Sequence, residues 1–186
     1  MKKVVMWIIL LSIVFSLKIT YNHLQQPTKN DVFNITENGF GSIEEVLFVR
    51  EIDGMWLTIF RHPHAITIAE LQQNWLGTWK FKNDATLSTT DYPPLLEDQI
   101  TWSGSGKSKE NAAYYFGMVT DPEIDTITVE TQDGFFEDVQ FIKYDGMRFF
   151  LKRADGLLVL PVNISGFSKS GELIYSSLQK IPDSID

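Results

Sequence analysis

Hydrophobic and polar residues alternate most regularly between Gly117 and Ser176. The clearest run consists of four alternate hydrophobic residues, Leu158, Leu160, Val162 and Ile164. An alternation of period two indicates strands with one buried face. Asp-Gly pairs and one Ser-Gly pair interrupt this pattern, and Asp-Gly is the strongest short hairpin signal. The breaks are Asp133-Gly134, Asp145-Gly146, Asp155-Gly156 and Ser170-Gly171.

Short strands separated by turn signals are typical of a β-sandwich or barrel. We therefore predict a mostly β fold, in which residues 98–177 form an immunoglobulin-like antiparallel sandwich of seven strands. Ala112–Val119 and Ile124–Thr131 are two of the expected strands. Residues 178–186 are then a C-terminal tail.

The part of the chain before the sandwich predicts a short helix followed by a β-meander, over residues 41–82. Ser42-Ile43-Glu44-Glu45 has the pattern of a capping box, in which serine and glutamate satisfy free backbone NH groups at a helix start. This pattern predicts a helix over Ile43–Phe48. Alternation and β-branched residues predict the strands that follow. These strands are Val49–Ile52, Met55–Arg61, Ala65–Leu71 and Trp75–Phe81, with a hairpin turn at Asp53-Gly54.

Two polar stretches are expected to lack regular structure. Residues 83–97 are rich in Thr, Ser and Asp and contain Pro93-Pro94, which predicts a linker between the two β modules. Ile100–Trp102 begins a strand, and Ser103–Asn111 (SGSGKSKEN) is expected to be a flexible loop tip.

The N-terminus has the pattern of an export signal. Lys2 and Lys3 precede Val4–Leu17, a hydrophobic run of 14 residues that only two serines interrupt. As a helix this run spans roughly 21 Å, whereas a bilayer core is about 30 Å thick. A membrane anchor would therefore need Lys18 to extend toward the headgroups and Ile19–Tyr21 to lengthen the span.

Residues 1–21 are thus a signal-anchor or a cleaved signal peptide. The segment has no A-x-A cleavage site, and Val14-Phe15-Ser16 is a permissible but poor substitute, which favours a retained single-pass anchor through residues 4–17. The alternative is secretion after cleavage. In both cases the lysines stay inside and the remainder lies outside. Residues 22–40, which are polar, are expected to be a flexible tether.

Charge and cysteine content exclude several classes of function. The formal net charge is −8, and retention of Lys2 and Lys3 inside leaves −8 − 2 = −10 on the exported part. An acidic chain repels phosphate backbones, so nucleic acid is excluded as a partner. The chain has no cysteine, which excludes disulfides, thiolate zinc sites and cysteine nucleophiles. An exported chain without cysteine fits a Gram-positive bacterium.

Few residues suggest catalysis. His62 and His64, which flank Pro63, are weak candidates for metal ligands. Zinc sites need three or four ligands, and the alternative is a turn with two surface histidines. Gly104-Ser105-Gly106-Lys107-Ser108 resembles the end of a phosphate-binding loop but lacks the first glycine, and a solvated loop is the better interpretation. Asp121, Glu123 and Asp125 are either a weak calcium site or solvated acids at a turn. We therefore predict no catalytic residues and no cofactor.

Tryptophan is the remaining indicator of a binding surface. Trp56, Trp75, Trp79 and Trp102 lie outside the hydrophobic N-terminal run. Most such residues belong to a core or to cross-strand pairs. If two or three lie exposed on one face, that face is a candidate surface for a protein or a glycan.

The motif YYFGMVTDPEI at residues 114–124 and the motif GFSKSGELIY at residues 166–175 resemble those of small exported proteins of Gram-positive, Bacillus-like bacteria. The helix start at residues 41–45 and the Asp53-Gly54 hairpin are similar to the same group, and the resemblance covers most of residues 40–176. It implies an exported β-rich fold and a bacterial source, and it carries over no active-site residues. Many such proteins have a lipoprotein cysteine, which this chain lacks.

Together these features predict a cell-envelope protein that acts as a non-catalytic binding module outside the membrane. Its expected partners are the membrane, through residues 4–17, and an envelope protein or wall polymer. The alternatives are an exported hydrolase that uses carboxylates or His62 and His64, and a spacer module without a specific ligand.

Overall fold

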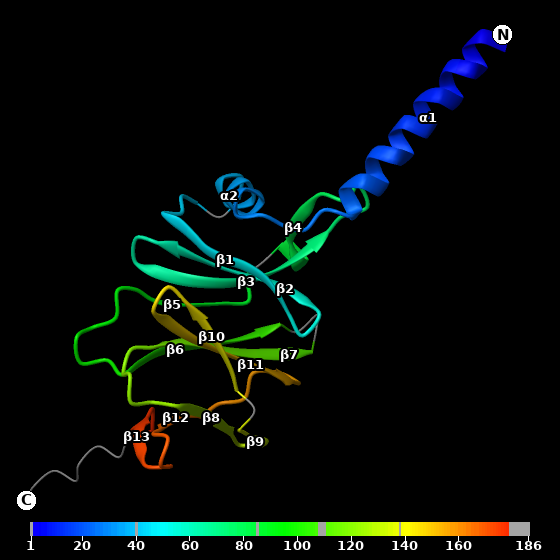
Figure 1. The fold of residues 1–186 in the computed structure, drawn as a ribbon. Helices are drawn as coiled ribbons and strands as arrows, with labels where there is room; N and C mark the ends of the chain where they lie inside the picture. The colour runs from blue at the N-terminus through cyan, green and yellow to red at the C-terminus, as the bar shows by residue number, and fades with distance from the viewer. Residues whose placement is uncertain (1, 40, 85, 108–110, 138, 179–186) are drawn as a thin grey trace, which may run out of the picture. The chain divides into compact units, whose positions relative to one another are not determined.

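The protein is described by a computed structural model that covers residues 2–39, 41–84, 86–107, 111–137 and 139–178. The chain forms two compact units (Figure 1). Residues 1–60 and 69–86 form the first unit, and residues 61–68 and 87–186 form the second, which we call the sandwich unit. The fold is mostly β, as predicted, with two N-terminal helices before the antiparallel sheets.

The first unit contains a helix packed on a β-sheet. Helix α2 contacts strands β1 and β4, and its buried Val32 joins a core that includes Phe60 and Phe81, whose rings stack 5.6 Å apart. The strand order is β1-β2-β3-β4. Strand β5 (Ser88–Asp91) pairs with Ala65–Ile68 at the start of β3, and both of these segments belong to the second unit. The elements are α1 (Lys2–His23), α2 (Lys29–Glu37), β1 (Glu45–Ile52), β2 (Met55–His62), β3 (Ala65–Gln73), β4 (Trp79–Phe81) and the 3-10 turn η1 (Lys82–Asp84).

The predicted helix over Ile43–Phe48 is wrong, because strand β1 begins at Glu45 and includes the rest of this segment. Val46, Leu47 and Phe48 are all buried, and burial in a sheet outweighs the local capping signal. The capping box instead lies in the predicted tether. The side chain of Thr28 accepts a hydrogen bond from Asp31 N at 3.2 Å, and Thr28 N donates to Asp31 Oδ2 at 2.8 Å. The segment 22–40 therefore contains helix α2 and is not a flexible tether.

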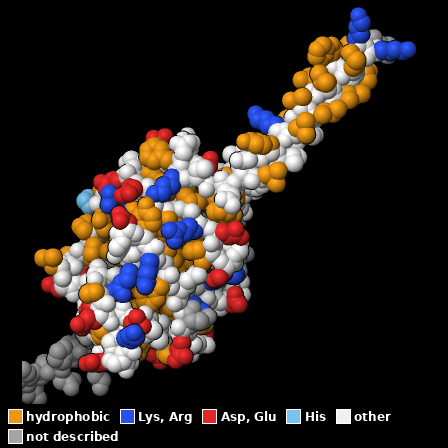
Figure 2. All heavy atoms as spheres, in the orientation of Figure 1, with side chains coloured by type: hydrophobic (Ala, Val, Ile, Leu, Met, Phe, Trp, Pro, Cys, Tyr) orange, Lys and Arg blue, Asp and Glu red, His pale blue; other side chains and the backbone are white. Residues whose placement is uncertain are grey.

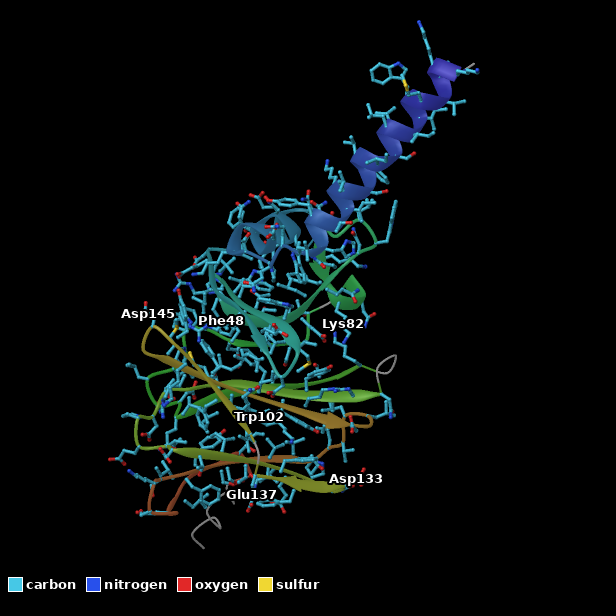
Figure 3. All side chains as sticks on the ribbon, turned by 45° about the vertical axis from the view of Figure 1, so that its right-hand side comes forward. Phe48, Lys82, Trp102, Asp133, Glu137 and Asp145 are labelled. Carbon is cyan, nitrogen blue, oxygen red and sulfur yellow. The ribbon has the colours of Figure 1, made fainter. Side chains whose placement is uncertain are left out.

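A partly buried ion pair joins strand β3 to the turn after β4. Lys82, labelled in Figure 3, donates to both carboxylate oxygens of Glu70 at 2.9 Å. Only 10% of the Glu70 side chain is exposed. The full pairing compensates the cost of burying this carboxylate.

The sandwich unit has two four-stranded antiparallel sheets, with strand orders β10-β11-β7-β6 and β13-β12-β8-β9. If β6 to β13 are read as A, B, C, C′, D, E, F and G, these orders become D-E-B-A and G-F-C-C′. This is the immunoglobulin-like arrangement, as predicted, but with eight strands rather than seven. The strands are β6 (Ile100–Lys107), β7 (Ala112–Val119), β8 (Thr126–Thr131), β9 (Gly134–Phe136), β10 (Gln140–Tyr144), β11 (Met147–Asp155), β12 (Val162–Phe167) and β13 (Leu173–Ser176).

The inner faces of the two sheets share one core. Tyr115 and Phe150 from the first sheet pack with Val129 and Ile164 from the second, and none of the four is more than 1% exposed. Every residue of β7 is buried, since β5 (Ser88–Asp91) lies against β6 and β7. Strand β7 is therefore the centre of the unit.

The Asp-Gly pairs form different turns. Asp53-Gly54 and Asp145-Gly146 are two-residue hairpin loops in which φ is positive at every residue, as the prediction requires. Asp145 marks the tip of the β10–β11 hairpin in Figure 3. In the β8–β9 hairpin the two loop residues are Gln132 and Asp133, one position before the predicted Asp133-Gly134 pair, because Gly134 already pairs with Thr131 in the sheet.

Asp155-Gly156 is not a hairpin turn. The chain leaves β11 there and crosses to β12 in the other sheet, and Gly156 N donates to Asn111 O at 2.7 Å. Ser170-Gly171 does form the turn between β12 and β13.

The two stretches predicted to be irregular contain strands. Strand β5 lies in the expected linker at 83–97, and β6 extends through Ser103 and Ser105 to Lys107. Serine hydroxyls hold these strands together: Ser88 Oγ lies 2.7 Å from Ser103 Oγ, and Ser105 Oγ donates to Leu87 O. Positions 108–110 of the predicted loop tip, and residues 179–186 of the predicted tail, lie outside the described residues.

Candidate membrane and interaction surfaces

Helix α1 is long and hydrophobic enough to cross a membrane. It has 22 residues, a mean hydropathy of 2.1 over 18 of them, and no buried residue. At 1.5 Å per residue it spans about 33 Å, which matches a bilayer core of about 30 Å. The hydrophobic run of 14 residues alone would be too short to span the bilayer core, but the helix continues through Tyr21 to His23 and reaches the required length. A signal peptide can have the same length and composition.

The hydrophobic side chains of α1 are distributed around the whole helix. Consecutive residues from Val4 to Leu11 are each between 51% and 64% exposed. Figure 2 shows hydrophobic side chains along the helix and Lys side chains at its first turn. A helix that is hydrophobic on all sides must be buried in protein or in lipid, and no part of the described structure covers this one.

Asn22 at the C-terminal end of α1, and Gln25 just beyond it, form four hydrogen bonds with β3, β4 and the loop between them. Asn22 Nδ2 donates to Leu76 O at 3.1 Å, and Trp79 Nε1 donates to Gln25 O at 3.2 Å. Gln73 Nε2 donates to Asn22 O at 3.0 Å and to Gln25 O at 3.3 Å. A polar hollow of about 360 Å³ lies beside this attachment, lined partly by Thr28 and Asp31.

Glycine at position 77 permits the close approach of α1. A Cβ atom there would lie 2.6 Å from Asn22 Cβ, a distance that side chains do not adopt. Gly77 also has a positive φ of 75°. The β3–β4 loop is thus built to receive the end of the helix.

The four candidate tryptophans do not share one exposed face. Trp56 and Trp79 pack edge to face at 5.9 Å against the core of the first unit. Trp102, labelled on β6 in Figure 3, packs against the sandwich core. Only Trp75, in the β3–β4 loop, is strongly exposed, at 73%.

The two candidate metal ligands lie at the β2–β3 hairpin. His62 ends β2, and His64 is exposed in the turn, where its carbonyl accepts a hydrogen bond from Tyr92 N at 3.1 Å. The third histidine, His23, belongs to α1 and donates to Ile19 O. Among the described residues, no three His, Asp or Glu side chains are grouped so that they could hold a metal.

The glycines of the phosphate-loop-like segment lie in a strand. Gly104 and Gly106 belong to β6, and a Cβ atom at either position would approach Leu158 at 3.2 Å. Leu158 belongs to the crossing between β11 and β12. The absence of side chains at Gly104 and Gly106 therefore makes room for Leu158 and not for a phosphate group. Position 108 lies outside the described residues.

The carboxylate of Asp121 is held by hydrogen bonds. Its Oδ1 accepts from Glu123 N at 2.9 Å and its Oδ2 accepts from Gln99 Nε2 at 3.0 Å. Arg148 donates to the carbonyls of Asp121 and Ile124. This network fixes the β7–β8 turn, which is a structural role for the first acid of the predicted cluster.

The β5–β6 loop exposes two leucines beside a hollow of the sandwich unit. Leu95 is 65% exposed and Leu96 is fully exposed. The hollow, of about 490 Å³, is lined by this loop and by Thr120, Asp121 and Pro122. The loop projects from the unit in Figure 1, and hydrophobic side chains protrude there in Figure 2. Sequence reasoning missed this surface, because Leu95 and Leu96 follow Pro93-Pro94 in a stretch that resembles a linker.

Two tyrosines of the sandwich unit have raised pKa values. Burial raises the pKa of Tyr115 above 10.0, although a hydrogen bond with the Val159 backbone opposes the shift. Burial also raises the pKa of Tyr175, and the charge of Asp98 adds to this, while a hydrogen bond from the Trp102 side chain opposes it. The Trp102–Tyr175 bond connects β6 with β13, one strand from each sheet.

No family model, curated protein or solved structure matched the chain in three comparisons with known proteins. The surfaces described above are therefore interpreted from their own chemistry.

Proposed function

We propose that the protein is a membrane-anchored binding module of the cell envelope, with its β units outside the membrane and no catalytic role. Helix α1 carries this proposal. It is hydrophobic on all sides, is long enough to span a bilayer, and has Lys2 and Lys3 at the end that would remain inside. The resemblance to exported proteins of Gram-positive, Bacillus-like bacteria supports the same location.

Retention of α1 is favoured over cleavage by the way its end is used. Asn22 and Gln25 take part in four hydrogen bonds with β3, β4 and the loop between them, and Gly77 fits closely against Asn22. Cleavage after Ser16 would leave this attachment on a short, frayed remnant of the helix. The anchor and the first unit therefore function as one piece.

The binding surface that the geometry supports best is the β5–β6 loop with its adjacent hollow. Exposed leucines provide a hydrophobic contact, and Glu97 and Asp98 in the same loop provide negative charge. Hydrophobic residues surrounded by charged ones are typical of protein interaction sites. The expected partner is an envelope protein with a hydrophobic side chain flanked by basic residues, in place of the tryptophan surface predicted from the sequence.

Site-directed photo-cross-linking in intact cells tests this proposal. A photoreactive amino acid at Leu96 should give one recurrent adduct, which Leu95→Asp should abolish. The matched control is Leu173, a second leucine of the sandwich unit that is 56% exposed on β13. Identical adduct patterns from the two positions, or none from Leu96, would contradict a binding role for this loop. An adduct that disappears after digestion of the wall would indicate a polymer partner.

A further inference from the structure

We propose that the β3–β4 loop, Asn74–Thr78, docks through Trp75 into the membrane–water interface on the external side of the membrane. The sheet of the first unit then lies against the lipid surface. This inference depends on the proposed anchoring by α1. It assigns a partner, the lipid headgroup region, to Trp75, which is the one strongly exposed tryptophan among the described residues outside α1. It rests on the position, rigidity and exposure of the loop.

The position of the loop follows from its contacts with α1. The residues that follow Trp75 touch the end of the helix: Leu76 O accepts from Asn22 Nδ2 at 3.1 Å, and Gly77 packs against Asn22. Asn22 lies one residue beyond Tyr21, where a span that starts at Val4 has covered about 27 Å. The loop is therefore at the depth where the hydrocarbon core ends.

The loop is held rigidly by its own hydrogen bonds. Asn74 Oδ1 accepts from Leu76 N at 2.9 Å and from Thr78 N at 3.0 Å. The Asn74 backbone forms two more bonds, with Thr78 O and with Gly77 N, each at 2.9 Å. Because these hydrogen bonds fix the loop, the exposure of Trp75 does not result from disorder. Its 73% exposure is a property of the fold.

Exposed residues next to the loop have the composition of a membrane interface. Tyr21 is 64% exposed and Leu24 is 76% exposed, and both lie on the chain segment that contacts the loop. Tryptophan and tyrosine concentrate at the headgroup level, because one end of each ring system is hydrophobic and the other is polar. Tyr21 and Trp75 would thus form a small aromatic belt where α1 leaves the membrane.

Quenching of tryptophan fluorescence by brominated lipids tests the inference. The full-length chain is reconstituted in vesicles of phosphatidylglycerol and phosphatidylethanolamine. Trp7→Phe removes the tryptophan inside the membrane, and Trp7→Phe/Trp75→Phe removes the proposed interfacial one as well. We expect the first variant to be quenched and the double variant to lose that quenching. Trp7→Phe/Trp102→Phe is the matched control and should remain quenched, because Trp102 packs in the sandwich.

Trp75→Phe alone, which keeps Trp7, separates this inference from the anchor. If Trp75→Phe is quenched but Trp7→Phe is not, α1 inserts while the loop stays in water, and the docking is overturned. If neither variant is quenched, α1 does not insert, and both proposals are overturned. Trp75 is mostly exposed, so its replacement should leave the circular dichroism spectrum unchanged.

Discussion

Gly117 is the most crowded glycine of the sandwich, and its replacement by alanine tests the packing around β7. A Cβ atom at this position would lie 2.3 Å from Thr101 O in β6 and 2.4 Å from the Phe150 ring in β11. Real Cβ atoms do not approach other atoms closer than 3.0 Å, so the nearest contact must open by 3.0 − 2.3 = 0.7 Å. Thr101 and Phe150 lie on strands that flank β7 on opposite sides, so a shift of β7 that opens one contact does not open the other.

The cost of Gly117→Ala should lie at the upper end of the range for overpacked cores. Overpacking by a methyl group costs typically about 1–3 kcal/mol, and here a backbone oxygen and a fully buried ring must both move. We expect a loss of about 3 kcal/mol in the free energy of unfolding. For a chain of this size each kcal/mol lowers the melting temperature by about 2–4 °C.

Gly104→Ala provides the matched control. It also introduces a methyl group in a strand of the same unit, but its nearest neighbour is the end of the Leu158 side chain at 3.2 Å, which can rotate away. We expect a change below about 1 kcal/mol. Urea unfolding of the full-length chain in detergent micelles, followed by tryptophan fluorescence, compares the two variants. Equal midpoints would show that Gly117 does not lie between Thr101 and Phe150, and would contradict the pairing of β7 with β6 and β11.

Three further predictions concern stability. Thr28→Ala removes the capping box of α2 and should cost about 1 kcal/mol of unfolding free energy, measured by urea titration; Asn30→Ala, at an exposed position that keeps the cap, should not. Gly146→Val places a β-branched residue at a φ of 76° and should cost a few kcal/mol, while an unchanged melting temperature would exclude the two-residue turn at this position. The folded pKa values of Tyr115 and Tyr175 are raised above 10.0, so their contribution to stability is complete below pH 10 and is lost as the pH rises through the folded values. The urea concentration at the unfolding midpoint should therefore decrease as the pH is raised beyond 10, and Tyr175→Phe should make this decrease smaller. A midpoint that does not change with pH would refute this prediction.

The sandwich was predictable because its signals are local and agree with its packing. Alternation in β8, together with the turns at Asp145-Gly146 and Ser170-Gly171, marks strands whose inner residues meet in one core. In β11 the alternation of Phe149 and Leu151 does not identify the inner face, because Phe150 between them reaches this core and all three are buried. The extra strand β9 was missed because it has three residues, and its turn is shifted by one position from the Asp-Gly pair.

The errors lie where tertiary contacts oppose local signals. The capping pattern at Ser42 favoured a helix, but three consecutive buried residues place this segment in β1. Helix α2 was missed because it is short and has few hydrophobic residues, although Thr28 and Asp31 form a complete cap. Strand β5 was missed because its Ser and Thr residues, typical of loops, are satisfied by hydroxyl pairs such as Thr67–Thr89 at 2.9 Å.

The candidate surfaces depend on exposure, which the sequence does not record. All four candidate tryptophans are equivalent as sequence signals, but the structure places three of them in packed positions and leaves Trp75 exposed. In the same way, Leu95 and Leu96 resemble ordinary loop residues in the sequence, and only the fold places a hollow beside them.

The proposed function requires that α1 is retained as an anchor and that both β units lie outside the membrane. The chain has no cysteine, so single cysteines can be labelled without background. We would introduce Lys3→Cys, Gly39→Cys and Asp133→Cys separately and treat intact Gram-positive cells with a membrane-impermeant maleimide. Gly39 has open space around its Cβ position, and Asp133 is exposed at a hairpin turn, so both substitutions should be tolerated.

We expect Gly39→Cys and Asp133→Cys to be labelled on intact cells and Lys3→Cys to be labelled only after the cells are permeabilised, with all three chains in the membrane fraction. Labelling of Lys3→Cys on intact cells, protection of the other two, or recovery of the chain from the medium would contradict the retained anchor.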